Sequence, residues 1–459
     1  MKGDIFIFPK DEQLTGDDLM GFIQAQERLV NNHYKRNYDL YVSKHKILNA
    51  QYEDLGMNNK LVVSMPKLLV DEYTGYFGGN EPQIQLDNDA DNELLKQWLS
   101  MVDFADEHSE VVKSVAIYGR GYLLEYQDEN SLPQIAHIEP DEGFMIYDDT
   151  VKTEPLAFVR YSYDNNHQVQ GTIYYANYSV NFKGSKLGDP EPYFWHEVPA
   201  QEFYSNEERQ GIFDSVVTLV DALDNALSRK ANQVDYFDNA YLAMLGVQFV
   251  DEKGNPVEPT INRQQRLIYV PDADAANAKI EFIEKPNGDS MQENLINRLI
   301  DLIYQTSMVP NLRDEAFSGN SSGVALQFKL LPMQNMAAFQ ERKFIKALRK
   351  LFKTVLESAD GGQIIPSVRN DSWKNMRFVY TRNTPENMAD SINTAVQASK
   401  LLSEESSIAL LPWIDNPQDE IKRKVEEKQD TLKRSLQNSI SAVDMAKKGG
   451  IGDGEEATE

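Results

Sequence analysis

Residues 307–330 of this chain read SMVPNLRDEAFSGNSSGVALQFKL, and the segments on both sides of this stretch decide the fold. Before it, leucines that recur every three or four residues predict a helix over 289–308. After it, the apolar spacing predicts a helix of about 35 residues that reaches Ser358. Pro332 lies inside this helix, and a proline there removes one backbone hydrogen bond, so we expect a kink. The quoted stretch is therefore a connection between two helices.

A second long helical pattern precedes this region. It begins at Ser215 and meets no proline or glycine until Gly246, which predicts a helix of about 30 residues over 215–246. Residues 247–286 then break into strand and turn patterns, VQFVDEKGNPVEP, LIYV and KIEFIEKP. Two helices that enclose a small β-rich insertion predict a helical hairpin with the insertion at its far end.

The N-terminal part of the chain changes from helical to strand patterns. Helices are predicted within 15–50, over 60–76 and from Asp87 onward. Aromatic and β-branched runs separated by turn clusters such as DEN and DDT then predict strands at Gly121–Tyr126, Ile135–Ile138, Phe144–Tyr147, Leu156–Tyr163, Gly171–Tyr178 and Phe194–Val198. We expect one meandering antiparallel sheet and an α+β fold.

The C-terminal part is predicted to be mainly helical. A short strand at Met376–Thr381 precedes a helix over 385–402. Residues 417–448 are highly charged, with apolar residues on one narrow stripe, so this helix needs a partner. We expect the tail, 449–459, to be disordered.

Length and composition limit the classes of function. The 459 residues, 52.3 kDa, allow several domains. Lys and Arg number 46 against 72 Asp and Glu, a net charge of −26, which argues against a uniformly basic surface for nucleic acid. The chain has no cysteine, which favours a reducing compartment and excludes thiolate sites. No apolar stretch is long enough for a secretion signal or a membrane span, so we expect no membrane partner.

The common catalytic and cofactor motifs are not matched. Gly319 to Gly323 has the wrong spacing for a nucleotide-binding loop and no lysine. The acidic run from Asp87 has Trp98 where a calcium loop needs a bidentate glutamate, and it reads better as an acidic helix N-terminus. The sequence after His196 breaks the HExxH zinc pattern. We therefore predict no catalytic residue, no metal, no cofactor and no enzymatic activity.

One stretch is strongly basic. Between 323 and 353 there is a single acidic residue, Glu341, against seven cations, which are Lys329, Arg342, Lys343, Lys346, Arg349, Lys350 and Lys353. Several recur at three and four residues and so share a helix face. This pattern leaves two interpretations open, a face that is solvated or paired with acidic neighbours, and a contact with a polyanion.

The stretch 307–330 resembles the portal proteins of long-tailed double-stranded DNA bacteriophages, whose pattern P-x-L/M-x-D-E-x-F-x-G-N-x-S-G-x-A-L it matches. Further pieces that resemble the family follow in the family's order, NNKLVVSMPKLLVDEYTGYFGGNEPQI (58–84), VVKSVAIYGRGYLLEY (111–126), IEPDEGFMIYDD (138–149) and SIALLPWIDNPQDEIKRKVEEK (407–428). The resemblance covers nearly the whole chain.

The resemblance implies a ring of about twelve copies at one capsid vertex of the virion, assembled in the host cytoplasm, through which DNA passes during packaging and ejection. It implies as partners double-stranded DNA, the terminase motor, scaffold and major capsid proteins, and head-completion or tail adaptor proteins. It also implies a division of the chain into a wing (1–214), a first stem helix (215–246), a clip (247–286), a second stem helix (287–310), a tunnel loop region (311–323), the rest of the wing with the kinked helix (324–402), a crown (403–448) and a disordered tail (449–459).

The resemblance and the basic stretch together give the candidate site residues. The tunnel loop facing DNA is matched by Asp314, Glu315, Phe317, Ser318, Gly319, Asn320, Ser321, Ser322 and Gly323, with Lys329 as the nearest cation. The small residues suit a mobile loop, and Ser321 or Ser322 suits equally a helix cap. Arg342 and Lys346 are predicted at a subunit interface and Pro332 at a helix kink.

A mostly acidic channel would repel phosphates and let DNA slide, which gives the net charge a physical reason. Two alternatives remain, a carboxylate-dependent phage nuclease and another ring of the head-tail connector.

Overall fold

The computed structural model describes residues 4–51, 58–193, 195–237, 241–247, 249–257, 267–270, 279–283, 289–312, 323–357, 371–384, 388–411, 414 and 417–448. The chain divides into two compact units, Met1–Arg382 and Asn383–Glu459. Helices and mostly antiparallel strands alternate in the first unit, and the described part of the second is helical. The predicted α+β class is confirmed by this mixture of helices and strands.

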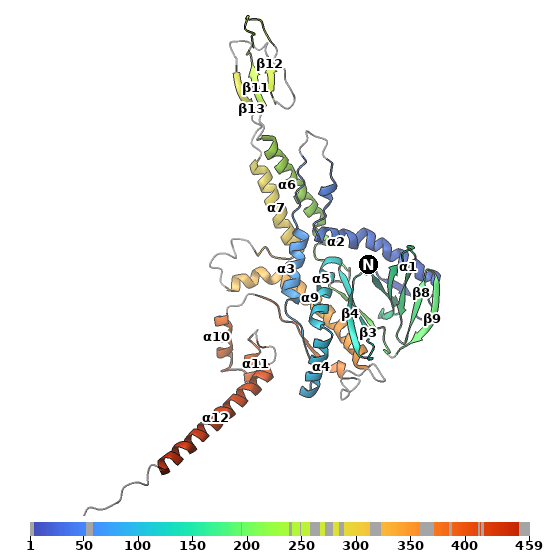
Figure 1. Cartoon of the computed structure of the whole chain (residues 1–459), viewed down its shortest axis with the longest axis vertical. Coiled ribbons are helices and arrows are strands. Elements are labelled where there is room, and N and C mark those ends of the chain that lie inside the picture. The colour runs from blue at the N-terminus through green and yellow to red at the C-terminus, as the bar shows by residue number, and fades with distance from the viewer. Residues whose placement is uncertain are drawn as a thin grey trace, which may run out of the picture. The chain divides into compact units, whose positions relative to one another are not determined.

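The largest sheet has six strands in the order β1-β5-β6-β7-β8-β9. Its strands are β1 (Phe6–Phe8), β5 (Gly143–Asp148), β6 (Pro155–Tyr163), β7 (Val169–Tyr174), β8 (Tyr178–Lys183) and β9 (Lys186–Pro192). Helix α1 (Gly16–Leu29) covers one face, where Leu19 and Ile23 pack against alternate residues of β5 and β6 such as Phe144 and Val159 (Figure 1). Thr15 begins α1 with a capping box to Asp18.

A second sheet has the order β10-β3-β4 and comprises β3 (Arg120–Gln127), β4 (Pro133–Ile138) and β10 (Ala200–Tyr204). The expectation of a single antiparallel meander is therefore wrong, because the strands form two sheets and β1 pairs with β5 in parallel. The strand predicted at Phe194–Val198 is also displaced. The strand that pairs with β3 is Ala200–Tyr204, beyond Pro199, which has no amide hydrogen to donate.

The main hydrophobic core lies between this second sheet and a group of helices. These are α3 (Met65–Gly78), α4 (Asp89–Met101), α5 (Phe104–Tyr118) and α9 (Gly323–Glu357). Phe344 of α9 is fully buried, with its ring centroid 5.3 Å from that of Phe77 and 5.1 Å from that of Phe203. A short sheet of β2 (Gln83–Gln85) and β14 (Arg377–Val379) closes this region. Helix α9 is thereby fixed across the centre of the unit.

The first predicted helical region, 15–50, is not one helix. It consists of α1, a π-helical turn η1 (Val30–Tyr34), α2 (Lys35–Tyr41) and a 3₁₀ turn η2 (Lys46–Asn49). Asn37, buried on α2, donates a 2.7 Å hydrogen bond to the carbonyl of Ile117. The two residues are 80 positions apart in the sequence, so no local residue pattern predicts this contact with α5.

Two helices pack side by side and lead away from the core, α6 (Val217–Phe237), which follows the 3₁₀ turn η3 (Asp214–Val216), and α7 (Asp289–Ser307) (Figure 1). Val220, Leu223 and Ile303 are fully buried at the base of this pair, whereas Val234 and Met291 are exposed at its other end. Figure 1 shows the strands β11 (Tyr241–Leu245), β12 (Leu267–Val270) and β13 (Lys279–Ile283) beyond that end.

The prediction of a single helix over 215–246 is wrong at its end. Helix α6 stops at Phe237, and Tyr241–Leu245 is the central strand of a three-stranded sheet. It pairs in parallel with β12 and antiparallel with β13. The apolar run YLAML suits either structure, and the two partner strands decide between them.

Hydrogen bonds to an extended segment hold α6 from Asp224 to Asn232. The amides of Asn59, Leu61 and Val63 donate to side chains of α6 at distances of 2.8 to 2.9 Å. Their acceptors, Asn232, Ser228 and Asp224, are spaced by four residues. Four residues of helix rise about 6 Å and two residues of extended chain about 6.6 Å, so the two spacings match.

The second unit contains α10 (Met388–Ala398), α11 (Glu404–Ile408) and α12 (Pro417–Lys448), with a short 3₁₀ turn, η6 (Ser372–Asn375), preceding it in the first unit. Lys424 of α12 forms a 2.6 Å ion pair with Glu404. Val425 and Leu432, on the predicted apolar stripe, are exposed. The predicted helix over 417–448 is confirmed.

Candidate functional site: helix α9 and its basic groove

Most of the predicted tunnel-loop residues lie outside the described part of the chain. These are Asp314, Glu315, Phe317, Ser318, Gly319, Asn320, Ser321 and Ser322. The structure resumes at Gly323, the first residue of α9. The neighbouring part of the candidate site is therefore α9, which carries all seven cations of the basic stretch.

Lys329 and Pro332 lie near the N-terminal end of α9. They line a hollow of about 440 Å³ together with the C-terminal end of α7, including Asp301 and Tyr304. The ammonium group of Lys329 is buried in the isolated chain. Helix α9 continues through Pro332, and the kink there stays a prediction. Both predicted residues therefore lie at the junction between α9 and α7.

The C-terminal half of α9 is held to the rest of the unit by ion pairs. Lys343, Lys350 and Lys353 pair with Glu207, Glu154 and Glu197 respectively, and the Lys350 pair measures 2.5 Å. Burial raises the pKa of Glu154, but Lys350 outweighs it, and the pKa of this carboxyl lies below its usual value. The hydrogen bond from Lys343 lowers the pKa of Glu207 in the same way. Part of the basic stretch is therefore already paired within the chain.

Other cations of α9 are exposed along a groove. The basic groove is formed by two adjoining hollows of about 670 and 400 Å³ that share Lys152, Lys346 and Lys350. Six cationic and two acidic side chains line the larger hollow, so its charge is opposite to that of the chain. The cations that line it are Lys152, Arg342, Lys346, Arg349, Lys350 and Lys353. Ile345, Val198 and Trp373 add an apolar wall.

Arg342 and Lys346 are exposed in this groove. The guanidinium carbon of Arg342 lies 5.5 Å from the ring centroid of Phe339. Lys346 contributes to lowering the pKa of both Glu154 and Glu207, each of which is paired with another lysine. Within the described ranges neither Arg342 nor Lys346 forms an ion pair, so both present positive charge to a ligand or partner.

A buried ion cluster supports the smaller hollow. Glu202 of β10 accepts a 2.9 Å hydrogen bond from Nη2 of Arg209 and lies 3.6 Å from Nη1 of Arg120. The hydroxyl of Tyr147 also donates to Glu202. All four residues are buried. Gly119 ends α5 at φ +85°, where a Cβ would lie 2.1 Å from the carbonyl oxygen of Arg209, so only glycine fits beside this cluster.

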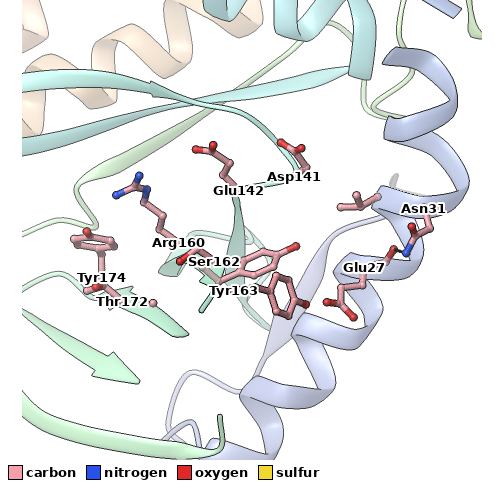
Figure 2. Close-up of a pocket in the computed structure, with 12 residues that line it drawn as sticks. Glu27, Asn31, Asp141, Glu142, Arg160, Ser162, Tyr163, Thr172 and Tyr174 are labelled. Carbon is pink, nitrogen blue, oxygen red and sulfur yellow. Dashed lines mark hydrogen bonds between the residues drawn. The ribbon is translucent and has the colours of Figure 1, made fainter. Parts of the chain in front are cut away.

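A separate hollow of about 570 Å³, at the other end of the largest sheet's β5–β6 hairpin, is acidic. Figure 2 shows Asp141 and Glu142 on the turn between β4 and β5, with Glu27 of α1 across the hollow. Arg160 and Tyr163 of β6 complete the wall. Burial, followed by the charge of Asp141, raises the pKa of the adjacent Glu139 to about 7. Negative charge is concentrated at this end of the sheet.

The sequence did not reveal the partners of the α9 cations. Lys152 and Glu154 lie in the turn between β5 and β6, and Glu197 lies in the loop that precedes β10. A turn or loop residue gives no periodic signal, so only the folded chain shows which helix it meets. Sequence reasoning found the cationic face and missed the groove around it.

In the part of the chain that the structure describes, no group of three or more His, Asp or Glu side chains is arranged to hold a metal ion. Among the described helices, none has the length and apolar character needed to cross a bilayer.

Comparisons with known proteins cover most of the chain. The family described as "Phage portal protein, SPP1 Gp6-like" matches residues 22–434. The portal protein of Bacillus phage SPP1 is 23% identical over 402 residues, which cover 82% of this chain and 77% of that protein. A solved structure entitled "Neck of empty GTA particle computed with C6 symmetry" shares 10% identity, with a TM-score of 0.44, over 75% of this chain and 89% of the other.

The family match extends across both compact units, from α1 into α12. The resemblance expected from residues 307–330 is thereby confirmed. The chain belongs to the SPP1-like family of phage portal proteins, which are structural components of the virion.

Proposed function

We propose that this portal protein assembles into a ring of about twelve copies at one capsid vertex, and that DNA passes through the ring during packaging and ejection. The family match over residues 22–434 carries this proposal. In this proposal the protein is a conduit and docking platform without enzymatic activity of its own, it is assembled in the host cytoplasm, and its partners at the vertex are scaffold and major capsid proteins.

The stem helices support the ring. In the isolated chain Met291 and Leu295 of α7 are 74% and 53% exposed, and Val234 of α6 is 52% exposed. Apolar side chains gathered on a helix pair favour burial against a neighbour. In a closed ring of identical copies every stem would have such neighbours. Residues 311–323 would then face the channel beside α9, and Lys329 is the cation of α9 assigned there.

The strands β11, β12 and β13 are proposed as the clip, which contacts the terminase motor and the head-completion or tail adaptor proteins. They lie beyond the stem helices, away from the main core, and the turn from Asp251 to Pro256 is exposed. Asp251 stabilises this turn by accepting 2.8 Å hydrogen bonds from the amides of Lys253 and Asn255. A rigid exposed turn is suited to contact with a partner.

Electron microscopy and native mass measurement of the purified full chain test the ring. We expect closed rings with a central hole. A chain that stays monomeric at micromolar concentration over a range of salt would contradict the proposed assembly.

A variant tests the clip. Replacing Asp251–Pro256 by two glycines should leave the rings intact and abolish packaging in phage that carry the variant. The control replaces the exposed residues Asn165–His167, in the turn between β6 and β7, by two glycines and should package normally. Loss of rings in the clip variant would instead identify this turn as an assembly element.

A further inference from the structure

The basic groove and the acidic turn lie at opposite ends of one hairpin. Strands β5 and β6 pair with Gly143 opposite Arg160 at one end and Tyr147 opposite Pro155 at the other. The Gly143 end adjoins the acidic turn, Glu139–Glu142, and the Pro155 end adjoins Lys152 and the basic groove. The four steps of strand from Gly143 to Tyr147 separate the two ends by roughly 13 Å. One rigid element therefore presents opposite charges in two directions.

Such an arrangement fits a ring of identical subunits. Its interfaces are head-to-tail, so each copy contacts its neighbours through two different and mutually complementary surfaces. Copies that each carry a net charge of −26 repel one another, and a concentrated positive surface is needed where they meet. Among the described hollows, the basic groove has this character.

We propose that the basic groove of one subunit binds the acidic turn, Glu139–Glu142, of the next copy of this chain. This inference rests on the proposed ring. Arg342 and Lys346 are the cations that would receive Asp141 and Glu142, because all four side chains are exposed. The Lys350–Glu154 and Lys353–Glu197 pairs already show carboxylates seated on this helix face.

The shape and chemistry of the groove favour a peptide segment over nucleic acid. Its wall includes Ile345, Val198 and the indole of Trp373, which the ammonium of Lys353 approaches to 5.7 Å from the ring centroid. Glu154 and Glu197 also line it and interrupt its cations, whereas a phosphate backbone is bound best by an unbroken run of positive charge. An acidic turn offers separate carboxylates for the exposed cations.

Charge reversal on both surfaces tests the proposal. The double variant Arg342→Glu with Lys346→Glu should raise the concentration needed for half-assembly at least about tenfold, and so should Asp141→Lys with Glu142→Lys. Combining all four substitutions should restore rings, because the charges are complementary again. Lys35→Glu with Lys186→Glu, two exposed lysines elsewhere, controls for the added negative charge. Thermal melting of each variant verifies its fold.

Three other outcomes of these experiments would overturn the proposal. If the fourfold variant stays dissociated while both double variants are folded, the groove binds something other than the acidic turn. If the Arg342/Lys346 variant forms normal rings and loses DNA binding or retention, the groove contacts nucleic acid. Failure of the unsubstituted chain to form rings would refute the proposed function itself, which separates the two failures.

Discussion

Glu202 and Glu125 are both buried, on the paired strands β10 and β3, and their surroundings shift their pKa values in opposite directions. Burial raises the pKa of Glu202, but the charges of Arg209 and Arg120 outweigh it and hold the pKa below its usual value. Burial raises the pKa of Glu125 well above 4.5, since Gln201 is a weak partner. One carboxyl therefore stabilises the fold when ionised, and the other when protonated.

Glu202→Gln is expected to lower the free energy of unfolding at neutral pH by about 3–5 kcal/mol, because two arginines stay buried without their counter-charge. The stabilisation by Glu202 is present above pH 4.5 and is lost as the pH falls below it, so the difference between the two proteins should shrink in acid. Urea unfolding of both proteins at several pH values measures this difference in the free energy of unfolding. Lys67→Ala, which breaks the exposed pair with Asp71, should cost less than about 1 kcal/mol. Equal effects would contradict the role of the cluster.

Glu125→Gln is expected to stabilise the protein at pH 8 by about 1–3 kcal/mol, since a buried charge is removed while the contact with Gln201 is kept. The folded state holds the Glu125 proton more tightly than the unfolded state, so stability falls as the pH rises from 4.5 through the raised pKa. Melting temperatures of both proteins between pH 4 and 8 should converge at the acid end. Parallel curves would show that Glu125 does not titrate in this range.

Among the helices, α9 contributes to three separate features of the structure. Its apolar face, with Phe344 and Phe352, fills the main core, and its opposite face carries the basic groove. Its N-terminal end meets α7 near Pro332. A change in the course of the helix at Pro332 would therefore move the end nearest the proposed channel, while the packed C-terminal half stays in place.

Pro332→Ala is expected to stabilise the chain by up to about 3 kcal/mol, since alanine restores a helical hydrogen bond and removes a steric clash. If the predicted kink positions the loop before α9, the same variant should package DNA poorly. Thermal unfolding and a packaging assay in phage separate the two effects. Asn335→Ala, an exposed change on the same helix, should alter neither strongly. Normal packaging by a stabilised Pro332→Ala protein would refute a functional kink.

At the scale of the whole molecule, the two compact units have unequal cores. The hydrophobic clusters formed by the described residues lie within Met1–Arg382, down to Met376 and Tyr380 near its end. The hydroxyl of Tyr380 lies 2.9 Å from Nε2 of the buried His108. The first unit is therefore predicted to fold without the second.

A chain ended after Arg382 is expected to unfold cooperatively within a few degrees of the full chain, because its core is complete. A chain ended after Asp371 should be markedly less stable, since it lacks β14 and the core residues Met376 and Tyr380. Circular dichroism during heating compares the two. A large loss of stability in the longer truncation would show that the second unit contributes to folding.

The family pattern in residues 307–330 and the apolar periodicity of the long helices are local features, so the linear sequence was enough to predict both. The predicted helices over 289–308 and 417–448 and up to Ser358 agree with α7, α12 and α9. It also located the cationic face of α9. These features depend on residues three or four apart, which a linear pattern records.

Features that depend on distant partners are recognisable solely in the folded chain. Tyr241–Leu245 is a strand because β12 and β13 pair with it, although its own residues fit a helix. The basic groove exists because Lys152, Glu154 and Glu197 are brought to α9 from turns and loops that are more than 140 residues away in the sequence. Strand pairing and charge pairing act through space, and no local pattern contains them.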